Sequence, residues 1–248
     1  RIRGISFDIS AGEIVGIAGV SGNGQTQLLE ILGGFPEKGA KISGEVRVNC
    51  QSLALIGLGS DAETRRERVI GHVPEDGQDE GLIMDFAAWE NVSFGYHNAP
   101  EYSNGIFIDR AAIRADAEGK IQRFDVRPPN PDLAARNFSG GNQQKIVVAR
   151  EVERNPDLLL IGQPTRGVDI GAIEFIHKRI VELRDAGKAV LLVSVELDEI
   201  MSLSDRVLVM FDGRLMVERD PETTTVGELG MLMAGMDDKP GAKPKGTA

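Results

Sequence analysis

The sequence predicts an α/β fold in which a largely parallel β-sheet is wrapped by helices. Apolar segments with strand character alternate with segments of helical period along most of the chain, which is the pattern of such a sheet. One apolar segment also runs directly into a glycine-rich loop that opens a helix. With 248 residues, the chain is long enough for one α/β domain that carries an inserted lobe.

Two strands are predicted near the start of the chain, at 5–9 and 13–19. Both segments are apolar, and a Ser-Ala-Gly turn at 10–12 separates them. A helix follows at 25–32, where leucine and isoleucine recur at helical spacing until Gly33-Gly34 ends the pattern. The predicted order is therefore strand, glycine loop, helix.

The middle of the chain predicts a second helix-to-strand unit. A short strand at 69–73 is followed by a loop-rich insert and by an amphipathic helix at 109–124 with an acidic residue at its start. The prolines of 127–131 break any helix there. A helix at 141–154 then leads into a buried strand at 157–161.

The last third of the chain continues the alternation. It predicts a helix at 171–186, a strand at 188–194, a helix from Leu197, a strand at 205–211 and a hairpin through Asp212-Gly213. Such an alternation is typical of a parallel sheet covered by helices.

The domain boundaries follow from these elements. We expect residues 1–235 to form one domain, with a helical subdomain at about 84–154 inserted into its core. From Asp237 on, no side chain is able to anchor a core, so we predict a disordered tail over 236–248. Because the chain starts with Arg1 rather than methionine, just before a predicted strand, we expect it to be part of a longer polypeptide.

The composition argues against two classes of partner. The formal net charge of -10 disfavours a surface that neutralises nucleic-acid phosphates or binds anionic lipid unaided. No apolar run approaches the roughly 20 residues of a membrane span, so membrane contact is expected through a partner. The single cysteine, Cys50, cannot form an internal disulfide and has no Cys or His at metal-ligand spacing, which fits a reducing compartment.

The glycine-rich loop is a candidate phosphate-binding loop. It follows an apolar strand and opens a helix, where main-chain N–H groups and the helix dipole favour phosphate oxygens. The alternative is a glycine-rich turn without a ligand. The candidate nucleotide-binding residues are Gly19, Val20, Ser21, Gly22, Asn23, Gly24, Gln25, Thr26 and Gln27.

One position of this loop departs from the phosphate-loop pattern. Gln25 stands where a lysine would place a positive charge on the β- and γ-phosphates, and an amide offers only a neutral donor. A charge-assisted hydrogen bond contributes about 1.5 to 3 kcal/mol, so triphosphate affinity should fall by roughly ten- to a hundredfold. Thr26 keeps the hydroxyl that ligates magnesium in active sites, so we expect a weak magnesium site there.

A second glycine pair opens the helix predicted at 141–154. Ser139 and the N–H groups of Gly140 and Gly141 lie at its start, where free donors and the dipole favour an anion. The alternative is a capping serine followed by two flexible glycines. The candidate residues of this segment are Ser139, Gly140, Gly141, Asn142 and Gln143.

The segment Asn137 to Lys145, NFSGGNQQK, strongly resembles the signature motif of ABC transporter ATP-binding proteins, in the form found in sugar and nucleoside importers. The resemblance covers nearly the whole chain except the tail. It implies a P-loop NTPase fold of the ABC type, with a RecA-like core, an antiparallel β subdomain and an inserted helical subdomain. It places Glu75 in the Q-loop, Asp169 in the D-loop and Val195 in the switch region.

Within this resemblance, four positions that carry chemistry are altered. Gln25 replaces the lysine, Gly162 the magnesium carboxylate, Gln163 the catalytic base and Val195 the switch histidine. A fifth departure is Glu75, which replaces the Q-loop glutamine. A positioned base contributes about 10² to 10⁴ in rate, and glutamine cannot accept a proton from water. We therefore expect a degenerate site that hydrolyses little or no ATP.

The signature segment, by contrast, is intact. In this family each nucleotide lies between the phosphate loop of one domain and the signature of another, so the resemblance implies that Ser139, Gly140 and Gly141 complete the ATP site of a partner domain. The chain as a whole most resembles the second nucleotide-binding domain of importers associated with lipoproteins of the basic-membrane-protein type. These importers carry nucleosides or simple sugars.

The same resemblance implies the cofactors, partners and location. ATP and Mg²⁺ are the expected cofactors. The expected partners are the N-terminal ABC domain of the same polypeptide, the transmembrane permease subunits and, indirectly, a substrate-binding lipoprotein, with no nucleic acid among them. The implied location is peripheral, on the cytoplasmic face of the bacterial inner membrane. The parent protein would be an ATPase that couples hydrolysis to import.

Aromatic residues leave two further questions open. Trp89, Phe94 and Tyr96 are candidate contacts of the permease, and packing within the helical lobe is the alternative for each. Phe7 is a poor candidate for stacking on adenine, which family members achieve with an aromatic residue before the phosphate loop.

Two other functions compete with that of an importer domain. An ABC ATPase acting on DNA or ribosomes would need coiled-coil insertions or basic arms, and the sequence has neither. A regulatory or scaffolding module that never binds nucleotide is opposed by the retained glycines and Thr26. The sequence does not indicate which solute is carried, since specificity resides outside the ATPase domain.

Overall fold

The computed structural model describes residues 2–53, 62–67 and 70–236. It forms two compact units, the first of Arg1–His72, Asp157–Gln163 and Ile180–Ala248, the second of Val73–Pro156 and Pro164–Arg179. The second unit contains the predicted lobe at 84–154 and extends beyond it at both ends. The predicted tail from residue 237 on and Val69 of the predicted strand lie outside the described residues.

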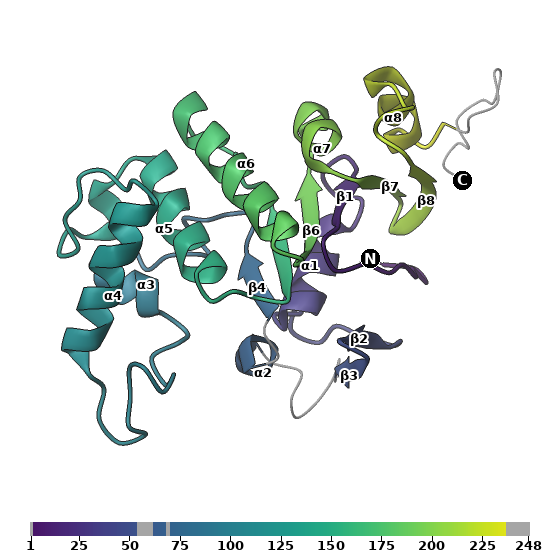
Figure 1. The fold of residues 1–248 in the computed structure, drawn as a ribbon. Helices are drawn as coiled ribbons and strands as arrows, with labels where there is room; N and C mark the ends of the chain where they lie inside the picture. Colours follow the sequence, from purple (N-terminus) through teal and green to yellow (C-terminus); the bar gives the residue numbers. More distant parts are fainter. Residues whose placement is uncertain (1, 54–61, 68–69, 237–248) are drawn as a thin grey trace. The chain divides into compact units, whose positions relative to one another are not determined.

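A six-stranded sheet has the order β4-β5-β6-β1-β7-β8 (Figure 1). β1 is parallel to β6 and β7, β5 is parallel to β6, and β8 is antiparallel to β7. The strands are β1 (Ile14–Ala18), β4 (Ile70–Val73), β5 (Leu158–Gly162), β6 (Ala189–Ser194), β7 (Arg206–Phe211) and β8 (Arg214–Arg219). The predicted α/β fold with a largely parallel sheet is confirmed.

The core of the first unit lies on this sheet. All five residues of β1 are buried, as expected for a parallel strand covered on both faces. Helix α1 (Gln25–Gly33) adds Leu28 and Leu29 to an apolar cluster that also contains Val15 and Ile17 of β1. The helical spacing of these leucines therefore fixes which side of α1 faces the core.

The first unit also contains short elements whose positions the local sequence patterns did not predict. A separate two-stranded ribbon joins β2 (Val46–Val48) to β3 (Gln51–Leu53). Helices α2 (Ala62–Glu67) and α8 (Val226–Met233) complete the set, together with the predicted α7 (Leu197–Leu203). These elements are short, so the sequence shows little of the period of a helix or strand in them. The β2–β3 ribbon has only three residues per strand.

The strand predicted at 5–9 is wrong. Ile5, Phe7 and Ile9 are half-buried at every second position and pack against the apolar cluster of the first unit, but they form no ladder with any described strand. An alternating pattern reports that one face of an extended segment is buried. A strand additionally needs a neighbouring backbone, which the pattern does not specify.

The second unit is helical. Helices α3 (Ala88–Ser93), α4 (Arg110–Arg123) and α5 (Gly140–Val152) pack against one another (Figure 1). Helix α6 (Ile170–Asp185) begins in this unit. The carboxylate of Asp109 caps α4 by accepting from the main-chain N of Ala112 at 3.0 Å, as an acidic N-cap should. The helices predicted at 109–124, 141–154 and 171–186 are confirmed.

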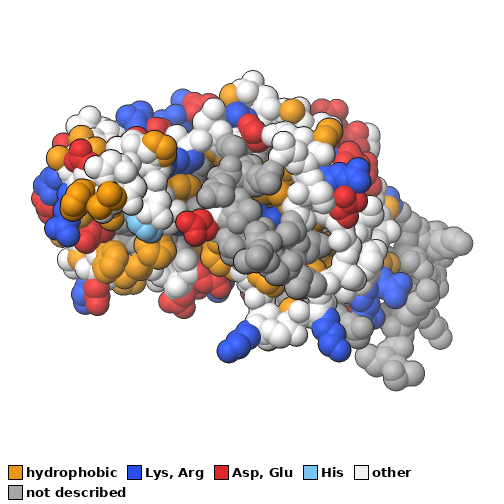
Figure 2. Space-filling model, turned by 90° about the horizontal axis from the view of Figure 1, so that it is seen from below, with side chains coloured by type: hydrophobic (Ala, Val, Ile, Leu, Met, Phe, Trp, Pro, Cys, Tyr) orange, Lys and Arg blue, Asp and Glu red, His pale blue; other side chains and the backbone are white. Residues whose placement is uncertain are grey.

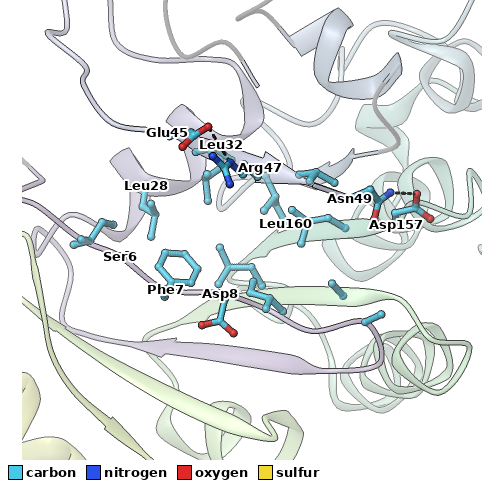
Figure 3. A pocket seen from close by; sticks show the side chains of 18 residues that line it. Ser6, Phe7, Asp8, Leu28, Leu32, Glu45, Arg47, Asn49, Asp157 and Leu160 are labelled. Atoms are coloured by element: carbon cyan, nitrogen blue, oxygen red, sulfur yellow. Dashed lines mark hydrogen bonds and ion pairs between the residues drawn. The ribbon is translucent and has the colours of Figure 1, made fainter. Parts of the chain in front are cut away.

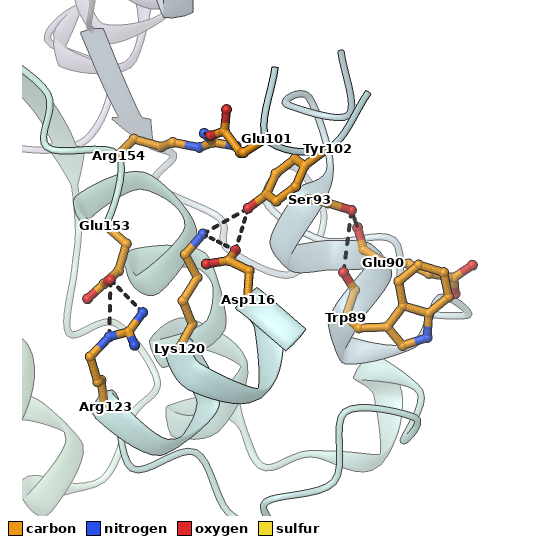
Figure 4. Close-up of polar contacts among 10 residues, drawn as sticks. All are labelled: Trp89, Glu90, Ser93, Glu101, Tyr102, Asp116, Lys120, Arg123, Glu153 and Arg154. Atoms are coloured by element: carbon orange, nitrogen blue, oxygen red, sulfur yellow. Dashed lines mark hydrogen bonds and ion pairs between the residues drawn. The ribbon is translucent and has the colours of Figure 1, made fainter. Parts of the chain in front are cut away.

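Helix α4 carries a largely buried ion pair that the Tyr102 hydroxyl joins (Figure 4). The Lys120 side chain is 4% exposed and its Nζ lies 2.6 Å from Asp116 Oδ2, to which the Tyr102 hydroxyl also donates. Burial acts to raise the pKa of Asp116, but the hydrogen bonds from Lys120 and Tyr102 outweigh it and lower this pKa. Burial, and then the bond to Asp116, raise the pKa of Tyr102.

Candidate nucleotide site and signature segment

Three strand ends meet at one edge of the sheet in the first unit. Ala18, the last residue of β1, is the register partner of Ser194, and Gly162 is the partner of Val193. The segments that follow these strands begin with Gly19, Gln163 and Val195. Parallel pairing therefore brings the predicted phosphate loop, base position and switch position together, as the carboxyl ends of parallel strands usually do for a ligand site.

The phosphate loop owes its shape to two glycines. Gly22 and Gly24 have φ angles of 92° and 107°, which side chains rarely adopt. At Gly24 a Cβ atom would also lie 2.9 Å from the Met210 side chain. The loop then opens α1, whose first N–H groups have no partner within the helix, and Thr26 lies half-buried in this first turn.

The side chain of Gln25 is folded onto the loop itself. It is 4% exposed, and its Nε2 donates to the main-chain O of Val20 at 3.3 Å. A Cβ atom at Gly19 would lie 2.2 Å from the same nitrogen, so only glycine allows this conformation. The amide therefore satisfies a loop carbonyl, whereas a lysine ammonium would bring a charge to this point.

Asn23 anchors the loop to the β7–β8 turn, a contact that the sequence analysis missed. Its main-chain O accepts from Gly213 N at 2.9 Å and its Oδ1 accepts from Asp212 N at 3.2 Å. The two segments are 189 residues apart in the chain, so no local signal could have predicted the contact.

The predicted base and switch positions contact each other. Gln163 has a φ of 44° and is 9% exposed, and its Oε1 accepts from the main-chain N of Val195 at 3.3 Å. Val195 itself is 36% exposed. Neither side chain can gain or lose a proton in the ordinary pH range, so this pair offers no general base.

The signature segment lies at the start of α5 in the second unit. Ser139 is the exposed N-cap residue and makes no side-chain capping bond to the helix. Its Oγ instead accepts from Asn142 Nδ2 at 2.8 Å. A Cβ at Gly141 would lie 2.8 Å from the carboxylate of Asp169, which also caps α6 through Ala172 N. The predicted D-loop residue and the signature are therefore in contact.

Gln143 connects the signature helix to the loop that follows Glu75. It is 4% exposed, and its Nε2 donates to the main-chain oxygens of Ala135 and Phe138 at 2.9 and 3.1 Å. Its Oε1 accepts from Gln78 Nε2 at 2.9 Å. The amide of Gln143 is thus fully used inside the lobe. Glu75 lies half-buried in the bend after β4, three residues before Gln78.

The three aromatic candidates for a permease contact differ in burial. The hydroxyl of Tyr96 donates to Glu151 at 2.6 Å and the guanidinium of Arg154 lies 4.5 Å from its ring, so Tyr96 packs within the lobe. Trp89 is half-buried in α3, whereas Phe94 is 44% exposed. Phe94 is therefore the candidate with the most surface free for a partner.

A cavity of about 310 Å³ lies in the first unit, between the extended residues 5–9, α1, β2 and β5 (Figure 3). Phe7 lines it and packs against the apolar cluster. The lining contains none of the predicted phosphate-loop, base or switch residues. Figure 3 shows two polar contacts at its border, Glu45 with Arg47 and Asn49 with Asp157.

The described surface carries mixed charge. On the face shown in Figure 2, acidic and basic side chains are interspersed among clusters of hydrophobic ones. Across residues 2–53, 62–67 and 70–236, no helix combines the length and apolar character needed to cross a membrane.

Residues 2–166 match the family described as ABC transporter, and the chain belongs to this family. The fold agrees with solved structures. A bacterial ABC transporter cassette solved as a dimer aligns with a TM-score of 0.74 and 24% identity over 89% of this chain and 90% of that one. A nucleotide-free ATP-binding cassette aligns with a TM-score of 0.71 and 21% identity over 88% and 85%. The ABC cassette fold predicted from the sequence is confirmed.

Curated relatives are import ATP-binding proteins. The guanosine import ATP-binding protein NupO of Bacillus subtilis is 45% identical over 99% of this chain and 47% of its own length. The nucleoside import ATP-binding protein NupA of Lactococcus lactis subsp. cremoris is 44% identical over 95% and 45%. The ribose import ATP-binding protein RbsA of Clostridium tetani is 33% identical over 91% and 43%. This chain spans about half the length of the curated relatives it matches.

Proposed function

We propose that this chain is one of two nucleotide-binding domains of a bacterial importer for nucleosides or simple sugars, and that it is the second of the two. Its own ATP site is degenerate, and its signature segment completes the ATP site of the first domain. The names of the matched relatives support import of nucleosides or of sugars such as ribose. Their lengths, about twice the matched part, leave room for a second domain.

The observation that carries the proposal is the contact between Gln163 and Val195. The phosphate loop, Gln163 and Val195 all follow strands that end at the same edge of the sheet. There the amide oxygen of Gln163 accepts from the main-chain N of Val195, and neither side chain can accept a proton from water. The loop itself keeps its glycine geometry. The pocket is therefore suited to hold a nucleotide and poorly suited to hydrolyse it.

A magnesium ion in this pocket would depend on the nucleotide. Within the described residues, no group of three or more His, Cys, Asp or Glu side chains is arranged to hold a metal ion. The hydroxyl of Thr26 fits one ligand position, and phosphate oxygens would supply others. Bound magnesium would neutralise phosphate charge, while Gln25, buried against Val20, would supply a neutral contact only.

The remaining partners follow from the same assignment. The importer would contain permease subunits in the inner membrane and a substrate-binding lipoprotein, and this domain would bind peripherally at the cytoplasmic face. Phe94 is our candidate for a permease contact because its ring is 44% exposed. No nucleic-acid partner is proposed for a chain with a net charge of -10.

The decisive experiment measures hydrolysis by the isolated chain and by the full importer. We expect near-background magnesium-dependent turnover for the isolated chain. In the importer, Ser139→Ala should lower turnover strongly, whereas Thr26→Ala should lower it by less than about threefold. Robust hydrolysis by the isolated chain that Thr26→Ala abolishes would refute the proposal.

A second candidate function is a regulatory or scaffolding ABC module. The bonds of Gln25 to the loop and of Gln163 to Val195 favour it, because each amide makes a hydrogen bond within the chain without a ligand. Calorimetry with ATP and magnesium separates the two functions. Heat of binding with a 1:1 stoichiometry supports a nucleotide site, and no heat supports the scaffold. A non-transport ABC ATPase remains a third class, which uptake assays in the importer would exclude.

A further inference from the structure

The side chain of Asn142 joins the signature serine to the segment that precedes α5. Its Oδ1 accepts from the main-chain N of Arg127 at 2.7 Å, and its Nδ2 donates to Ser139 Oγ at 2.8 Å. Asn142 is half-buried, whereas Ser139 is exposed. Arg127 lies fifteen residues before Asn142, beyond the end of α4.

These two bonds determine the direction of the serine proton. A main-chain N–H can only donate, so the oxygen of the Asn142 amide must face Arg127 and its nitrogen must face Ser139. An amide nitrogen also only donates, so Ser139 Oγ is the acceptor in the second bond. The hydroxyl proton must therefore point away from Asn142, and within the described part of the chain it donates to no residue.

The result is a set of donors at the start of α5 that the Ser139 oxygen does not occupy, beside the Asp169 carboxylate. The side-chain oxygen of a serine N-cap usually accepts from a main-chain N–H of the first helical turn. That bond occupies both the serine oxygen and the N–H group. Here the serine makes no such bond, so the N–H groups of Gly140 and Gly141 and the hydroxyl proton stay available at the same helix start. Such a set matches a ligand that only accepts, such as a phosphate group.

We infer that Asn142 is a positioning residue, which holds the Ser139 hydroxyl as a donor towards the terminal phosphate of ATP bound by the partner domain. This inference rests on the function proposed above and adds the device that orients the signature serine. It also links that serine to the main chain at Arg127, so a displacement of the segment after α4 would turn the hydroxyl. Asn142 itself does not need to touch the nucleotide.

The test uses the complete importer and measures kcat and KM for ATP. Asn142→Asp keeps an acceptor for Arg127 but cannot donate to Ser139, so the hydroxyl donates to the new carboxylate and its proton is withdrawn from the phosphate. We expect kcat to fall about ten- to a hundredfold, as for Ser139→Ala, with a much smaller change in KM. Asn142→Ala, which only frees the hydroxyl to rotate, should have a weaker effect.

A double variant and a matched control make the test specific. Asn142→Asp combined with Ser139→Ala should be no slower than Ser139→Ala alone, because Asn142 acts through that hydroxyl. Asn104→Asp makes the same charge change in an exposed turn of the second unit, where an aspartate still accepts from Ile106 and Phe107, and should leave kcat unchanged. Thermal unfolding of each variant shows whether it is folded, and Asn142→Ala replaces Asn142→Asp if the latter is not.

The outcomes separate this inference from the proposed function. If Ser139→Ala leaves kcat unchanged, both are overturned. If Ser139→Ala lowers kcat and a folded Asn142→Asp does not, or if the two effects multiply in the double variant, the positioning role is overturned and the proposed function stands.

Discussion

The helices that open with glycine loops, α1 and α5, both bury apolar side chains, and α5 also buries an ion pair. Helix α1 is anchored in the first unit by Leu28 and Leu29, which belong to an apolar cluster. Helix α5 carries an ion pair between Arg150 and Glu151, whose side chains are 5% and 1% exposed. Both helices leave their first N–H groups free of side-chain caps. The same backbone arrangement therefore rests on an apolar cluster in α1 and on apolar side chains together with a buried ion pair in α5.

The side chains at the two helix starts also differ, in their burial and in their hydrogen-bond partners. Gln25 Nε2 donates to the loop carbonyl of Val20, whereas Ser139 is exposed and its Oγ accepts from Asn142 Nδ2. The glycine geometry of the loop is thus present with a neutral side chain at position 25, because main-chain geometry and side-chain chemistry are separate features. The shape of the loop and the chemistry of its side chains therefore need separate tests.

The largest expected effect is on the charged support of α5. Arg150→Met should destabilise the chain by about 4 kcal/mol, because it removes a buried ion pair with Glu151 and the bond from Arg150 to the main-chain O of Gly81. Denaturant unfolding measures this. Arg123→Met, which breaks a pair whose arginine is 51% exposed, is the control and should cost less than about 1 kcal/mol. Equal costs would contradict the contrast between the two supports.

The apolar support of α1 should respond next. Leu29 is 2% exposed, so Leu29→Ala should cost about 3 kcal/mol through lost burial and the cavity left behind. Met231→Ala, at a side chain that is 53% exposed, should change the free energy of unfolding by less than about 0.5 kcal/mol. The prediction fails if the two variants unfold at the same denaturant concentration.

A lysine at position 25 tests whether a positive charge in the phosphate loop raises ATP affinity without raising turnover. Gln25→Lys should tighten ATP binding about tenfold by adding a charge-assisted bond, as calorimetry with magnesium would measure. Hydrolysis should stay near background because Gln163 and Val195 are unchanged. Gln122→Lys adds the same charge at an exposed position of α4 and should not alter affinity. A large gain in turnover for Gln25→Lys would show that the base position is not the limiting defect.

The smallest effect concerns pH in the second unit. The pKa of Asp116 is lowered in the folded chain, so its contribution to stability is present above the ordinary pKa of about 3.9 and is lost as pH falls through the folded value. The free energy of unfolding should therefore fall more steeply between about pH 5 and 3 for the natural chain than for Asp116→Asn. Parallel curves would argue that the carboxylate has no lowered pKa.

Much of the fold was predictable because its signals are local. The apolar run of β1, the leucine spacing of α1 and the acidic cap of α4 each specify an element within a few residues. The segment at 5–9 shows where this fails, since its alternating pattern gave the buried face correctly but implied a strand pairing that does not occur. The short β2–β3 ribbon had too few residues to give a signal.

The candidate site divides in the same way. The loop glycines, the signature segment and the prediction of a degenerate site all came from residue types at fixed spacings along the chain. The bond of Val195 to Gln163, that of Asp212 to Asn23 and that of Asn142 to Ser139 became known from the folded chain alone. Hydrogen-bond direction depends on which atoms meet in space, and residues brought together from distant segments carry no local record of that meeting.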